Sequence, residues 1–111
     1  MALAVFVQEG QQIDYTPPAD CAAGDVVVQG DLVGVARSAI AAGTPGSLAV
    51  AGVFDLSKAS ATEFTAGAKV YWDATNKLAV TTDGGGANKL VGKAVRAAGA
   101  GATTVRVRLS Q

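Results

Sequence analysis

The chain has 111 residues, a formal net charge of zero, one cysteine and no histidine. This length fits a single domain over residues 1–111 and leaves no room for a separate catalytic module. An intrachain disulfide is excluded because Cys21 has no partner, and the lack of histidine removes the commonest general base and metal ligand.

The hydrophobic residues predict a thin core. There are fifteen Val but only seven Leu, two Ile, three Phe, one Met and one Trp, and alanine makes up much of the remainder. Alanine buries little area, and burial stabilises a protein by only about 25 cal/mol per Å² of apolar surface. A domain built in this way gains stability by association, so we expect an oligomer.

Alternating or β-branched apolar segments, separated by Gly, Pro and Asp residues, predict short strands along the whole chain. The predicted strands cover residues 3–7, 13–15, 26–28, 32–35, 48–57, 70–72, 78–80, 90–95 and 105–109. Residues 73–76 have the composition of a hairpin turn, whereas residues 60–64, although spaced as a helix cap, are too few for a helix and are predicted as a loop. The sequence therefore predicts an all-β fold, a small barrel or sandwich of eight to ten short, mostly antiparallel strands.

The first eight residues are predicted to form an N-terminal arm or edge strand, in which Leu3, Val5 and Val7 alternate with other residues. No earlier element covers the edge of such a strand, so it is open to pairing with a strand of another chain. The three apolar side chains would then fill pockets and attach the protein to its partner. The alternative is that this strand completes the subunit's own barrel. The run lacks a basic leader and is interrupted by Glu9, so we expect neither a signal peptide nor a membrane span.

Acidic and basic residues are unevenly distributed. Residues 1–83 have a charge balance of −5 and residues 84–111 a balance of +5. Either the last strands pair with acidic earlier ones and the charges cancel, or the molecule has faces of opposite charge that suit packing against a neighbouring copy. Four of the basic residues, Lys93, Arg96, Arg106 and Arg108, could also form a basic face for nucleic acid.

A nucleic-acid-associated accessory protein that uses the basic C-terminal segment is the alternative function class. Binding to single strands usually combines cations with aromatic platforms, yet residues 84–111 contain no aromatic residue and the pI is near 6.1. We therefore predict no nucleic-acid partner and assign Arg106 and Arg108 to a protein contact. Tyr71 is added as an interface anchor, because it faces away from Trp72, which is predicted to pack in the core.

No residue pattern predicts an enzyme. Residues 87–94 match a phosphate-binding loop loosely, but Ala94 stands where Ser or Thr would hold Mg²⁺, and the flanking residues are predicted as strand. The seven aspartates lie singly beside turns, without the spacing of a calcium loop. We predict no catalytic, cofactor-binding or metal-binding residues, no cofactor and no small-molecule substrate.

Eight short motifs follow one another along nearly the whole chain. They are FVQEG at 6–10, AGDV at 23–26, LVGVA at 32–36, VAGVF at 50–54, FTAG at 64–67, KVYWD at 69–73, LVG at 90–92 and VRVRL at 105–109. In this order the chain resembles a family of small phage and prophage proteins, which are similar to the capsid decoration (cement) proteins of tailed phages. Some members carry a predicted recombinase label, which nothing in this sequence supports.

The resemblance implies a structural virion protein. A member would be a compact β-barrel-like subunit, synthesised in the host cytoplasm and assembled as a homotrimer on the outside of the phage head. There it would bind the major capsid protein and stabilise contacts between capsid subunits. The family supplies no catalytic residues.

Overall fold

The computed structural model describes residues 4–6, 8 and 10–110 and is all-β, with 45% of residues in strands and 3% in helical conformation. Its strands are β1 (Gln12–Tyr15), β2 (Val26–Gln29), β3 (Leu32–Ala36), β4 (Gly46–Ala49), β5 (Val53–Ser57), β6 (Lys69–Asp73), β7 (Leu78–Val80), β8 (Lys89–Ala94) and β9 (Thr104–Leu109). One 3₁₀ turn, Gly84–Gly86, lies between β7 and β8. All pairings between these strands are antiparallel, so the predicted fold class is confirmed.

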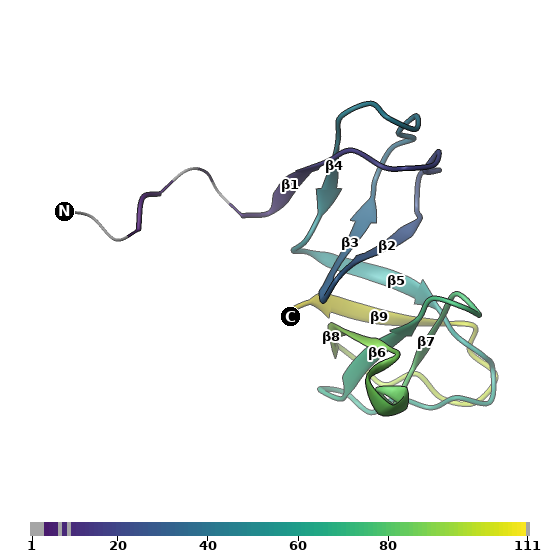
Figure 1. The fold of residues 1–111 in the computed structure, drawn as a ribbon. Coiled ribbons are helices and arrows are strands. Elements are labelled where there is room, and N and C mark those ends of the chain that lie inside the picture. Colours follow the sequence, from purple (N-terminus) through teal and green to yellow (C-terminus); the bar gives the residue numbers. More distant parts are fainter. Residues whose placement is uncertain (1–3, 7, 9, 111) are drawn as a thin grey trace.

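The strands form two sheets that lie one above the other (Figure 1). The smaller sheet has the order β1-β4-β3-β2, and the larger has the order β5-β9-β8-β6-β7. A parallel bridge joins Lys58, which directly follows β5, to Ala79 of β7. This bridge brings the two outer strands of the larger sheet together, so that the sheet curls into a small five-stranded barrel.

Alternation along the strands explains how the two sheets share one core. Val33 and Val35 of β3 point toward the barrel and belong to the same buried cluster as Val105, Val107 and Trp72. The other face of the smaller sheet carries a second cluster, which loops cover. Its buried members are Ala36, Ile40 and Leu48. Apart from Leu48 and Pro17, the largest fully buried side chains are valines, as the thin core predicted from the composition requires.

The prediction of one continuous strand over residues 48–57 is wrong, because these residues belong to two strands, β4 and β5, which lie in different sheets. The division falls at Gly52, whose φ of +115° is a conformation that side-chain-bearing residues rarely adopt. Strong alternation on both sides of Gly52 concealed the break. The loop predicted over residues 60–64 forms no helix.

The N-terminal segment stands apart from both sheets. Ala4, Val5 and Phe6 belong to no strand and are exposed, and the first paired strand begins at Gln12. The strand predicted over residues 3–7 is therefore not formed by residues 4–6, while Leu3 and Val7 lie outside the described residues. Residues 4–6, which Figure 1 draws in purple between grey traces, do not complete the barrel.

Candidate functional site: the outer face of the barrel

The last strand presents cations on the outside of the barrel. Val105, Val107 and Leu109 are buried, whereas Arg106 and Arg108 alternate with them and point outward. This confirms the buried and solvent-facing sides predicted for residues 105–109. The outer face of the barrel, formed by the outward side chains of β5, β6, β8 and β9, therefore contains both arginines that were assigned to a partner contact.

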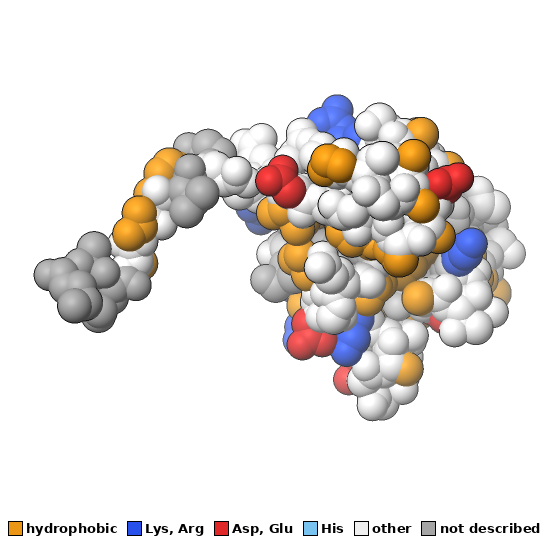
Figure 2. Space-filling model, turned by 45° about the horizontal axis from the view of Figure 1, so that its top comes forward, with side chains coloured by type: hydrophobic (Ala, Val, Ile, Leu, Met, Phe, Trp, Pro, Cys, Tyr) orange, Lys and Arg blue, Asp and Glu red, His pale blue; other side chains and the backbone are white. Residues whose placement is uncertain are grey.

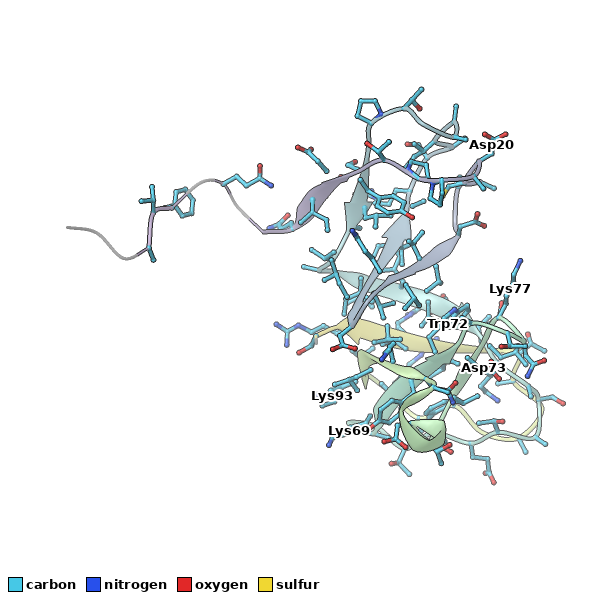
Figure 3. All side chains as sticks on the ribbon, in the orientation of Figure 1. Asp20, Lys69, Trp72, Asp73, Lys77 and Lys93 are labelled. Carbon is cyan, nitrogen blue, oxygen red and sulfur yellow. The ribbon has the colours of Figure 1, made fainter. Side chains whose placement is uncertain are left out.

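Strand pairing aligns three cations across this face. Lys69 of β6 lies opposite Lys93 of β8, and Lys93 lies opposite Arg108 of β9. Figure 3 shows Lys69 and Lys93 side by side on the barrel, away from the smaller sheet. We call Lys69, Lys93 and Arg108 the basic row.

The basic row carries no counterion from within the described part of the chain, where none of its three side chains forms an ion pair. Like charges placed opposite one another destabilise a sheet. The row continues into Val53, which lies opposite Arg108 and is 54% exposed. Three cations without an ion-pair partner among the described residues, next to an exposed apolar side chain, form a surface suited to an anionic partner.

Arg106, by contrast, is already engaged within the chain. Its Nε and Nη2 atoms donate to the two carboxylate oxygens of Asp55, at 2.9 and 3.2 Å. Hydrogen bonding to Arg106 lowers the pKa of the Asp55 carboxyl, the charge of Arg96 lowers it further, and the same ion pair raises the pKa of Arg106. Of the two predicted arginines, only Arg108 is therefore free of an ion pair with a described carboxylate.

A second ion pair links the two sheets, since Lys89 Nζ lies 2.8 Å from Asp31 Oδ1 at the tip of the β2–β3 hairpin. This bond lowers the pKa of Asp31. Lys89 and Arg106 thus pair with earlier acidic residues, as the first interpretation of the charge asymmetry predicted. Lys93 and Arg108 form no ion pair with an acidic residue that the structure describes, so charge cancellation among the described residues is incomplete and leaves the basic row.

Tyr71 lies on the same face as the basic row. It follows Lys69 by two residues on β6, lies opposite Leu90 of β8 and is half-buried. Trp72 points the other way and is 6% exposed, which confirms its predicted place in the core. Strand pairing thus places an aromatic side chain beside the cations, although none occurs within residues 84–111. The sequence analysis did not include Lys69 in this face, although the alternation of Lys69 with Tyr71 would have placed the two residues on the same side of the strand.

The remaining predicted contact residues lie elsewhere. Val5 is in the N-terminal segment, 75% exposed, and is not part of the outer face. Leu3 and Val7 are outside the described residues. The structure therefore places Tyr71, Arg106 and Arg108 on the outer face of the barrel and Val5 outside that face.

The described residues form neither a phosphate-binding loop nor a metal-binding cluster. The segment that loosely matches a phosphate-binding loop, residues 87–94, contains strand β8, as its apolar residues predicted. Within residues 4–6, 8 and 10–110, no three His, Cys, Asp or Glu side chains gather as a metal site would require. Over the same residues, no helix has the length and hydrophobicity needed to cross a membrane.

The lowered pKa values of three aspartates predict how the stability of the fold depends on pH. The carboxyls of Asp31, Asp55 and Asp73 have lowered pKa values in the folded protein, the last through hydrogen bonds from Asn76 and the Thr75 amide. Below pH about 4 the unfolded chain takes up protons that the folded chain binds less readily. The thermal midpoint, followed by circular dichroism, should therefore stay level from pH 7.5 to 5 and fall below pH about 4. A transition between pH 5 and 7.5 would contradict this, because the chain has no histidine. The Asp55→Asn variant should show a smaller acid-induced fall.

Comparison with known proteins gives the family. The family model described as phage cement protein matches residues 7–109, a span that contains every strand of both sheets. No curated protein and no solved structure matched the chain. The match agrees with the resemblance carried by the eight sequence motifs and extends over both sheets and the outer face. The chain therefore belongs to the phage cement protein family, that of capsid decoration proteins.

Proposed function

We propose that this protein decorates the outside of a phage head as a homotrimer, where it binds the major capsid protein and stabilises contacts between capsid subunits. Family membership associates the chain with a phage capsid. The role is structural, without catalysis, cofactor or small-molecule substrate. The protein is made in the host cytoplasm and joins the head there. A bound subunit that spans two capsid subunits stabilises the assembled shell because it binds that state alone.

The basic row is the observation that carries the proposed contact. Lys69, Lys93 and Arg108 are aligned without an ion pair to a described carboxylate, and Val53 extends the row with an apolar side chain. Acidic groups on a capsid subunit would relieve the repulsion within the row and accelerate encounter. Burial of Val53 and Tyr71 would add affinity as water leaves the contact.

Reversal of one charge in the basic row should weaken binding to undecorated heads. The Arg108→Glu variant is expected to bind about tenfold less tightly at moderate salt, a change equal to about 1.4 kcal/mol. Cosedimentation of purified protein with heads over a range of concentrations measures this effect. The thermal midpoint should not fall, because the substitution relieves the repulsion with Lys93.

Arg37→Glu is the matched control, since Arg37 is exposed and lies in the loop that follows β3 of the smaller sheet, away from the outer face of the barrel. This variant changes the net charge by the same amount but leaves the outer face intact. Equal binding of both variants to heads, at the wild-type level, would remove the basic row from the contact. Equal weakening of both would show that only net charge matters.

A nucleic-acid-associated accessory role is the second candidate, because Tyr71 adjoins the basic row. Cations beside an aromatic side chain are the elements of single-strand binding. Such binding would weaken steeply as salt rises, since cations that contact phosphates release counterions. Fluorescence anisotropy with labelled oligonucleotides tests it directly. Retention on heads in the presence of saturating DNA favours decoration, whereas loss of head binding under the same conditions favours the second candidate.

A further inference from the structure

The smaller sheet has an open edge at β2. In the antiparallel β2–β3 ladder, Val27 pairs with Gly34, and the Ala36 amide donates to the Asp25 carbonyl at 2.9 Å. Residues along such a ladder alternate between bonding to the neighbour and pointing away from it. The amides and carbonyls of Val26 and Val28 therefore point outward, and no other described strand pairs with them. An edge of this kind is a template for a strand from another chain.

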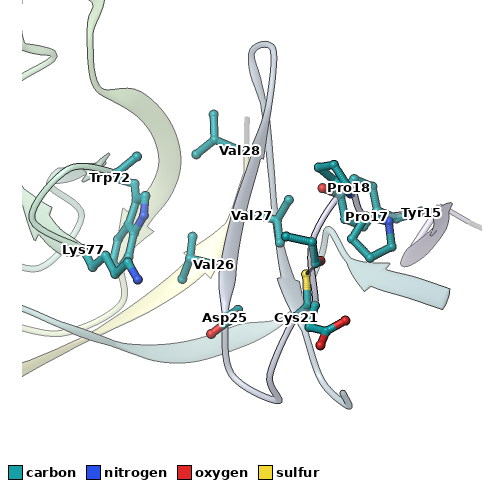
Figure 4. Close-up of a pocket in the computed structure, with 13 residues that line it drawn as sticks. Tyr15, Pro17, Pro18, Cys21, Asp25, Val26, Val27, Val28, Trp72 and Lys77 are labelled. Carbon is teal, nitrogen blue, oxygen red and sulfur yellow. Dashed lines mark hydrogen bonds between the residues drawn. The ribbon is translucent and has the colours of Figure 1, made fainter. Parts of the chain in front are cut away.

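A pocket straddles this edge and has a volume of about 340 Å³. All three valines of β2 line it, and Figure 4 shows their side chains alternating between its two sides. Val26 and Val28 face Trp72 and Lys77, whereas Val27 faces Tyr15, Pro17, Pro18 and Cys21. A strand added to β2 would therefore place successive side chains in the two different sides of the pocket, as in recognition by strand addition.

The segment suited to this edge is the chain's own N-terminal arm. Val5 and Phe6 are 75% and 79% exposed, more than any other large hydrophobic side chain described. Figure 2 shows the hydrophobic side chains of this segment standing clear of the body. The arm leads into β1, which forms one edge of the smaller sheet, whereas β2 forms the opposite edge. The arm therefore leaves its own subunit on the side away from its own pocket, and a second copy is the source of the arm that fills it.

We propose that residues 3–8 of one copy add as a strand to the free edge of β2 in the next copy, with alternate side chains in the two sides of the pocket. Because arm and pocket lie on opposite edges, the contact is head-to-tail, and repetition about an axis closes a ring. The inference deepens the proposed function, since it identifies the surfaces through which copies of the decoration protein associate. It does not depend on which surface contacts the capsid.

Native Cys21 in the pocket provides a direct test. Single cysteines are introduced at positions 3 to 8 in turn, and each full-length protein is oxidised gently at high concentration and analysed without reductant. Disulfides between copies should form with Cys21 at positions of one parity and at most weakly at the other, since a strand turns alternate side chains to opposite sides. The same substitutions combined with Cys21→Ser should give no product at the favoured positions, and Ala61→Cys, at an exposed site far along the chain, should give little.

A yield that does not vary with parity, or the absence of cross-links between copies, would overturn the proposal. Cross-links within one chain would show that the arm folds back onto its own pocket, and cross-links to capsid protein on heads alone would assign the pocket to a capsid strand. Deletion of residues 1–8 should shift the protein to monomer in light scattering and keep its strand circular dichroism, while the thermal midpoint falls and no longer depends on protein concentration. A cross-link yield that is the same at every position refutes arm exchange. If Arg108→Glu still weakens binding to heads in that case, the proposal of decoration stands. A cross-linking yield that alternates with position, in a protein that does not bind heads, supports arm exchange and refutes decoration.

Discussion

Replacement of Gly92 by alanine is expected to destabilise the protein by about 3 kcal/mol or more, beyond the usual cost of overpacking. A Cβ at this position would overlap the carbonyl oxygen of Arg108 and lie 2.9 Å from the Ser110 amide nitrogen. Both are backbone atoms, one in β9 and one in the residue that directly follows β9, and backbone atoms cannot move aside as a flexible side chain can. Relief of the overlap would require β8 and β9 to separate where the barrel core is fully buried.

The expected measurement is a thermal midpoint at least about 10 °C below that of the wild type, since 1 kcal/mol corresponds to about 4–8 °C in a domain slightly smaller than this. The matched control is Gly99→Ala, because nothing lies within 4 Å of a Cβ at Gly99 and its φ is not positive. That variant should have the wild-type midpoint or a slightly higher one. Similar midpoints for the two variants would mean that β8 and β9 do not approach as closely as the structure places them.

Replacement of Lys58 by methionine is expected to cost about 2–4 kcal/mol. Lys58 is only 3% exposed, and its Nζ donates to the carbonyl oxygens of Thr62 at 2.6 Å and of Ala59 and Gly99 at 3.2 Å. These bonds tie the loop after β5 to the loop before β9, beside the bridge to Ala79 that closes the barrel. Methionine preserves the length of the side chain but leaves three carbonyls without this donor.

Chemical denaturation of Lys58→Met measures the loss, and Lys69→Met is its matched control. Lys69 is exposed on the outer face and makes no ion pair with a described residue, so its replacement should change the free energy of unfolding by less than about 0.5 kcal/mol. If Lys58→Met is as stable as Lys69→Met, the three hydrogen bonds contribute nothing net. Loss of stability without loss of strand circular dichroism would place the damage in the two loops.

Local sequence features determined most of the strands and turns. Alternation predicted that Val105, Val107 and Leu109 are buried, because side chains on successive residues of a strand point to opposite faces. The turn after β6 was likewise predictable, since the carboxylate of Asp73 accepts hydrogen bonds from the amides of Thr75 and Asn76 at 3.0 and 3.2 Å. The order of eight short motifs was enough to indicate the family, which the match over residues 7–109 confirms.

Tertiary structure alone decided which strands meet. Alternation along a strand shows which face of the sheet each residue occupies. It does not show which strand lies beside it or in what register the two strands pair. The sequence therefore predicted outward cations on β9, yet only the pairing of Lys69, Lys93 and Arg108 formed the basic row and left Arg106 with Asp55. The same limit applies to the break at Gly52, the burial of Lys58 and the open edge of β2. Each depends on contacts between residues far apart in the chain, whose geometry is fixed by packing the two sheets on one core.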